Sequence, residues 1–138
     1  GFPGAEGFDL ILNNLKTIIE NTDWQPIVTS TNKASSDIVQ GSVSNIIINK
    51  INAGVSINTY LGHGAVSATE IGLDDPELFD NKGKYPFSFS LGCNSGNIHT
   101  TGYSLSEAFL FSPKGSISYL SSSAVGTDGA YFVYGQKL

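Results

Sequence analysis

The amino-acid sequence predicts an α/β fold with a mostly parallel central sheet flanked by helices. Apolar residues at helical spacing alternate along the chain with short β-branched runs, which is the pattern of such folds. Helical crossovers return the chain in the same direction, so that successive strands pair in parallel. The length of 138 residues suits one domain or a part of one. We expect the order helix, strand, helix, strand, loop, strand, helix and strand.

The first three elements follow from local patterns. A helix is expected from Asp9 to Asn21, where apolar residues recur at helical spacing before the turn-forming NTDWQP. The β-branched segment PIVTST, residues 26–31, predicts a strand. A second helix is expected from about Ser36 to Ala53, stopped by the glycine of NAG. Trp24 precedes the strand, and we expect it to pack against the first helix.

Two further strands each end in a glycine-rich turn. Residues 55–64 alternate apolar with small or polar side chains and end in Gly-His-Gly, which places His63 just past a strand. Residues 65–84 are polar and turn-rich and predict a loop with one short helical turn. The stretch PFSFSLGC predicts the next strand and places Cys93 at its carboxyl end.

The last elements are a short helix and a strand. Ser104 and Glu107 have the spacing of a capping box, in which each side chain bonds to the backbone N–H of the other residue. A helix is therefore expected to open at Ser104. The run GSISYLSSS, residues 115–123, predicts the final strand.

Composition excludes some classes of partner. Seven basic and twelve acidic residues give a net charge of −5 without a basic cluster, so a nucleic-acid partner is not expected. No stretch approaches the roughly 18 apolar residues of a membrane span. Charged residues make up only 14% of the chain, while Ser, Thr, Asn and Gly are abundant. This balance favours a secreted or cell-surface protein; the oligomeric state stays open.

Cys93 is the only cysteine, so the chain forms no intramolecular disulfide. A thiol attacks as its thiolate, and a neighbouring imidazole can take its proton. His63 and Cys93 both fall at the carboxyl ends of predicted parallel strands, where ligands bind in open α/β sheets. Gly62, Gly64 and Gly92 beside them permit close approach of a substrate backbone. Taken singly, Cys93 is equally well explained as a buried apolar side chain, and His63 is more often a loop residue with satisfied hydrogen bonds.

Two other chemistries are weaker alternatives. His99 follows Cys93 by six residues and suggests a metal site with His63, but two His and one Cys fall short of the four ligands of structural zinc. The chain is also rich in serine. It lacks the Gly-x-Ser-x-Gly elbow of serine hydrolases, so a serine nucleophile is not expected.

Three ordered motifs resemble the C25 cysteine peptidases, the gingipain family. They are VSINTYLGHGA, then PFSFSLGCNSGNIH, then SLSEAFLFSPKGSISYLSSS. The family has a Tyr-x-Gly-His-Gly turn, a Pro-initiated strand that carries the catalytic Cys about thirty residues later, and a helix that leads into a Gly-initiated strand. Here His63 and Cys93 are 30 residues apart. The resemblance covers most of the chain from about Asp37 to Ser123.

The resemblance implies a caspase-like α/β sandwich and a cysteine endopeptidase, or a related cell-surface peptidase that cleaves sorting signals and transfers the product. Cys93 would be the nucleophile and His63 the general acid/base. The backbone N–H groups of Gly64 and Cys93 would form the oxyanion hole. The substrate would be a peptide or protein. Residues 1–138 would be a single peptidase-like catalytic domain that continues on both sides of this chain.

The family also suggests less specific assignments. An AEG stretch at the end of an earlier strand supplies an acid that orients the His, which makes Glu6 a candidate third member. Asp9 is the only acid near the shortened loop that follows, and is the candidate for the substrate pocket. The chemistry requires no cofactor, and a structural calcium ion stays open. The alternative is a non-catalytic peptidase-like module that binds proteins.

Overall fold

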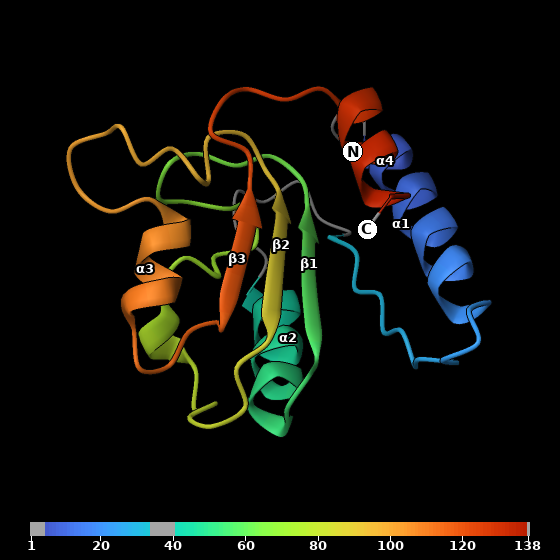
Figure 1. Cartoon of the computed structure of the whole chain (residues 1–138), viewed down its shortest axis with the longest axis horizontal. Coiled ribbons are helices and arrows are strands. Elements are labelled where there is room, and N and C mark those ends of the chain that lie inside the picture. Colours follow the sequence, from blue (N-terminus) through green and yellow to red (C-terminus); the bar gives the residue numbers. More distant parts are fainter. Residues whose placement is uncertain (1–4, 34–40, 138) are drawn as a thin grey trace. The chain divides into compact units, whose positions relative to one another are not determined.

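The computed structural model describes residues 5–33 and 41–137 and divides the chain into two compact units (Figure 1). The smaller unit is Gly1–Ser36 with Thr127–Leu138, and the larger is Asp37–Gly126. The smaller unit contains α1 (Ala5–Glu20) and α4 (Asp128–Gly135). The larger contains α2 (Gly41–Ala53), β1 (Ile57–Leu61), the 3₁₀ helix η1 (Pro76–Leu78), β2 (Phe87–Leu91), α3 (Leu105–Phe111) and β3 (Ser118–Ser121).

The sheet of the larger unit confirms the predicted parallel arrangement. Its three strands lie in the order β1-β2-β3, and both pairs are parallel (Figure 1). Leu61 pairs with Leu91 at the carboxyl ends of β1 and β2, and Ser90 pairs with Ser121 between β2 and β3. Because all three strands run the same way, their carboxyl ends lie along one edge of the sheet.

The core of the larger unit joins both of its α-helices to the loop after β1. Its buried members are Ile51, Leu73, Phe79, Leu105 and Phe109. The Phe109 ring packs edge-on against Phe79 and tilted against Tyr119, with centroids 5.6 and 5.5 Å away. Each such side chain stabilises the fold by about 1.5–3 kcal/mol when fully buried. These contacts hold α3 against β3, beside which it lies in Figure 1.

The capping box at the start of α3 is confirmed. The backbone N–H of Ser104 donates to Glu107 Oε2 at 2.9 Å, and the N–H of Glu107 donates to Ser104 Oγ at 3.4 Å. The Ser104 hydroxyl also donates to Oε2 at 2.8 Å. These hydrogen bonds, first that from the backbone N–H and then that from the hydroxyl, favour the carboxylate and lower the pKa of Glu107.

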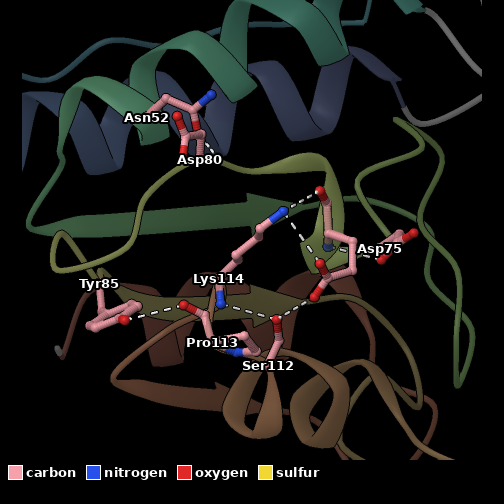
Figure 2. Close-up of polar contacts among 8 residues, drawn as sticks. Asn52, Asp75, Asp80, Tyr85, Ser112, Pro113 and Lys114 are labelled. Carbon is pink, nitrogen blue, oxygen red and sulfur yellow. Dashed lines mark hydrogen bonds and ion pairs between the residues drawn. The ribbon is translucent and has the colours of Figure 1, made fainter.

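Polar contacts tie η1 to the connection between α3 and β3 (Figure 2). Lys114 Nζ lies 3.4 Å from Glu77 Oε2, and the Ser112 hydroxyl donates to Glu77 Oε1 at 3.0 Å. The Tyr85 hydroxyl donates to the Pro113 carbonyl at 3.1 Å. Because these residues precede β2 and β3, the contacts fix the amino ends of these strands. The carboxyl edge of the sheet, where His63 and Cys93 lie, is held by different contacts.

Two predictions for the smaller unit are wrong. Residues 26–31 form no strand: the N–H of Val28 donates to Glu20 Oε1 at 3.2 Å, and Ile27 is 96% exposed. A β-prone segment becomes a strand only where a neighbouring strand takes its hydrogen bonds. Trp24 is 91% exposed and does not pack on the helix.

The helices of the smaller unit pack on each other. Leu15 of α1 is buried, and a Cβ added at Gly135 of α4 would lie 3.0 Å from Leu15 Cδ1. The helix α4 was not predicted, although Thr127 is a typical N-cap residue whose hydroxyl accepts a hydrogen bond from the N–H of Ala130 at 3.4 Å. Of the predicted second helix, residues 41–53 are confirmed and 36–40 lie outside the described residues. No helix in the described ranges has the length and apolar character to cross a membrane.

Candidate active site

His63 and Cys93 follow adjacent strands at equivalent positions. Leu61 and Leu91 are the last residues of β1 and β2 and are register partners. His63 and Cys93 each come two residues later. The prediction that both lie at the carboxyl edge of a parallel sheet is therefore confirmed, and the two turns that bear them are neighbours.

The two turns touch through their backbones at glycines. A Cβ added at Gly64 would lie 3.0 Å from the Cα of Gly92 and 3.2 Å from the backbone nitrogen of Cys93. Such distances are too short for a side chain to enter without moving the backbone. Glycine is needed here because it lets the turn after His63 lie directly on the turn before Cys93.

The Cys93 turn is also held from the β3 side. Asn94 adopts a left-handed backbone conformation with φ of 58°, which asparagine tolerates better than most residues. Its N–H donates to the Ala124 carbonyl at 3.0 Å, and the N–H of Gly96 donates to the Ser122 carbonyl at 2.9 Å. The chain after β3 thus fixes the loop that turns away from Cys93.

A buried hydroxyl supports this turn from below. The Ser95 side chain is fully buried, and its hydroxyl donates to the Gly92 carbonyl at 3.0 Å. It also shares a hydrogen bond of 3.0 Å with the Ser90 hydroxyl of β2. Cys93 itself is half-buried, with Sγ 3.8 Å from the Gly126 carbonyl oxygen. Cys93 therefore lies on a backbone that is held from two sides, and the residue is partly exposed.

The His63 turn is fixed by a tyrosine that sequence reasoning left without a role. His63 is exposed. The Tyr60 hydroxyl donates a hydrogen bond to the His63 carbonyl at 2.6 Å. The same hydroxyl accepts a hydrogen bond from the N–H of Glu70 at 3.3 Å. Burial raises the pKa of Tyr60 far above its ordinary value of 10.0, so the phenol remains protonated. The signal for this role was the tyrosine three residues before the histidine.

Glu6 and Asp9 lie in the other compact unit. Both fall in α1, so the AEG stretch belongs to a helix rather than to the end of a strand as the resemblance implied. The helical pattern begins earlier than Asp9, because alanine and glutamate also favour helix. The side chain of Glu6 is outside the described structure. A role for either acid stays a prediction.

His99 does not join a metal centre in the parts of the chain that the structure describes. It is exposed, and its N–H donates to Asn97 Oδ1 at 3.1 Å. Within the described ranges, no three His, Cys, Asp or Glu side chains gather to hold an ion. The chemistry that this edge offers is that of a thiol and an imidazole on neighbouring turns.

Comparisons with known proteins agree with this geometry. The family model of peptidase family C25 matches residues 8–138. A comparison with curated protein sequences finds no significant match. Two solved structures resemble the chain at 18% sequence identity: the complex of the pro- and mature domains of RgpB from Porphyromonas gingivalis, with a TM-score of 0.71, and the Arg-specific cysteine proteinase gingipain R, with 0.70.

The likeness covers most of this chain and a smaller part of the solved structures. It spans 88% of this chain and 29% of the first protein, and 94% of this chain and 32% of the second. The chain thus spans about a third of the length of either gingipain chain. The fold it shares with them is the caspase-like α/β fold, as the sequence motifs implied.

Proposed function

Because the chain belongs to peptidase family C25, we propose that it carries the catalytic dyad of a cysteine endopeptidase, with Cys93 as nucleophile and His63 as general acid/base. The observation that carries the proposal is the equivalent position of the two residues, each two residues beyond the paired Leu61 and Leu91. Parallel strands lie about 4.8 Å apart, within reach of a side chain. The partly accessible thiol also suits attack on a bound peptide.

In the proposed reaction the Cys93 thiol gives its proton to His63 and attacks the scissile carbonyl carbon. A C–S bond forms and the carbonyl electron pair moves to oxygen. When the intermediate collapses, the C–N bond breaks and His63 returns the proton to the leaving amine. Water, deprotonated by His63, then attacks the thioester and releases the acid and the thiol. No cofactor takes part in these steps.

The N–H groups of Gly64 and Cys93 are the proposed oxyanion donors. They belong to the two turns whose backbones lie against each other, one after His63 and one that bears the thiol. A donor of this kind lowers the barrier by about 3 kcal/mol when it meets the developing charge. The close contact between Gly64 and Gly92 places the two donors on adjoining turns.

The proposed substrate is a peptide or protein. The residue before the cleaved bond stays open, because the loop that carries the acid of the pocket in the family is shortened here. From the family resemblance, Asp9 and Glu6 are the proposed acids for the substrate pocket and for orienting His63, respectively. We place the enzyme outside the cytoplasm or at the cell surface, supported by the low charged fraction of 14%.

The test is peptidase activity of the full-length protein with Cys93→Ala and His63→Ala, together with iodoacetamide labelling of the thiol. Both variants should lose activity by several orders of magnitude, as for other residues that act as a unit. His99→Ala is the matched control, because His99 is also exposed and lies near Cys93 in the sequence. Activity that survives Cys93→Ala would exclude this nucleophile. A parent protein without hydrolysis and with a thiol of ordinary reactivity would support the non-catalytic binding module.

A further inference from the structure

Tyr60 lies against both turns of the candidate active site. A Cβ added at Gly62 would lie 2.6 Å from the Tyr60 hydroxyl oxygen, and one added at Gly92 would lie 3.2 Å from Tyr60 Cε1. One glycine precedes His63 and the other precedes Cys93. The phenol ring is therefore packed against the backbone of both turns at the carboxyl ends of β1 and β2.

The hydroxyl of Tyr60 also fixes one turn by hydrogen bonds. It donates to the carbonyl of His63 at 2.6 Å and accepts from the N–H of Glu70 at 3.3 Å. Glu70 belongs to the loop after β1, beside the bridge between Gly64 and Thr69. A single hydroxyl thus connects the end of the strand, the His63 backbone and the returning loop.

The environment keeps this hydroxyl a donor. Burial is the main cause that raises the pKa of Tyr60, and the carboxylates of Glu70 and Asp74 act in the same direction. The hydrogen bond from the Glu70 backbone lowers the pKa, but its effect is smaller than that of burial. The phenol is therefore neutral at physiological pH.

We propose that Tyr60 is a positioning residue that fixes the backbone of His63 against the Cys93 turn. This inference rests on the proposed peptidase function. Tyr60 acts through the carbonyl of His63 and through its contacts with Gly62 and Gly92. Without its hydroxyl the His63 turn gains freedom, and the imidazole spends less time where it exchanges a proton with the thiol.

Tyr60→Phe tests the hydroxyl and keeps the ring. In the full-length protein, kcat should fall about tenfold or more, because small displacements of catalytic groups are costly, while KM changes less than about twofold. Rates are expressed per active site, measured by titration with a peptidyl acyloxymethyl ketone, which labels the thiol only in an assembled active site. Protein that fails to fold is thereby removed from the comparison.

Tyr85→Phe is the matched control. Tyr85 also donates its hydroxyl to a backbone carbonyl, that of Pro113 at 3.1 Å, but it lies at the amino end of β2 (Figure 2). Its loss should leave kcat unchanged. A second variant replaces Tyr60 with 4-aminophenylalanine, which restores an N–H donor at the same place and should recover most of the lost kcat.

The outcomes separate this inference from the proposed function. If His63→Ala retains activity, the proposed dyad fails whatever Tyr60 does. If His63→Ala and Cys93→Ala are inactive but Tyr60→Phe keeps the parent kcat per active site, only the positioning role is overturned. An equal loss in Tyr85→Phe, or no recovery with 4-aminophenylalanine, overturns it as well. A loss of kcat in Tyr60→Phe alone, with recovery, establishes it.

Discussion

The backbones of Gly64 and Cys93 are in contact: a Cβ added to the glycine would lie 3.2 Å from the cysteine nitrogen. These residues come from turns that follow different strands and are 29 positions apart in the chain. There is no room for a side chain at Gly64. The contact and the pairing of β1 with β2 therefore both determine the distance between the two turns.

Gly64→Ala should push the two turns apart. The added methyl meets the Cα and the carbonyl carbon of Gly92, at 3.0 and 3.1 Å, and backbone atoms cannot swing away as a side chain can. We expect the free energy of unfolding to fall by about 1–3 kcal/mol and kcat per active site to fall with it. Gly7→Ala is the control for an added methyl without a clash, because its Cβ would meet nothing within 4 Å. Since Gly7 lies in α1, the unfolding free energy of this variant should not fall and should rise by about 0.5–1 kcal/mol. Unchanged kcat in Gly64→Ala would show that the contact does not control the site.

Ser95→Ala should loosen the Cys93 turn from beneath. The substitution removes the hydroxyl that donates to the Gly92 carbonyl and leaves the Ser90 hydroxyl without this neighbour. We expect a loss of about 1–3 kcal/mol in unfolding free energy, measured by urea denaturation, because the group is fully buried. The rate of Cys93 alkylation by iodoacetamide should also change. A variant with parent stability would contradict the support assigned to Ser95.

Ser104→Ala should destabilise the fold by removing the cap of α3. The serine caps α3, and replacing such a cap by alanine costs about 1 kcal/mol. Urea denaturation measures this loss. The exposed Ser118 of β3 provides a comparison, since Ser118→Ala removes no cap. Equal losses for the two variants would argue against a specific capping contribution.

Glu107→Gln should remove part of the dependence of stability on pH. The pKa of Glu107 is lowered in the folded protein from its ordinary value of 4.5 by hydrogen bonds from Ser104, first from the backbone N–H and then from the hydroxyl. A lowered pKa stabilises the fold above the unfolded pKa, and this contribution is lost as the pH falls from 4.5 through the folded pKa. Unfolding free energies measured from pH 7 to pH 3 should therefore decline less steeply in Glu107→Gln. A slope equal to that of the parent would contradict this.

Features that depend on local sequence were predicted well. The cap of α3 needs only Ser104 and Glu107, three residues apart, and it forms as expected. The strands that end before His63 and Cys93 carry their own signals, alternation and a terminal glycine, so the placement of both residues at the sheet edge was predictable. Parallel pairing then followed from the order of helices and strands.

Features that depend on distant partners were not predictable. The segment 26–31 has the composition of a strand but takes no place in the described sheet. The helix α4 contains the run YFVY, whose aromatic and β-branched residues favour strand, and packing against α1 outweighs that preference. The tyrosine three residues before His63 is visible in the sequence, but its hydrogen bond to the His63 carbonyl depends on how the turn folds back, which the sequence pattern does not show.

The pairing of Leu61 with Leu91 decides where insertions and deletions are harmless. The loop between β1 and β2 can lengthen at its exposed tip, around Lys82, at little entropic cost and without moving either strand end. One residue added inside β1 has a different effect, because it turns every following side chain of the strand to the opposite face. The separation of 30 residues between His63 and Cys93 can therefore grow at this tip. Any redesign of this sheet has to keep His63 and Cys93 two residues beyond Leu61 and Leu91, respectively.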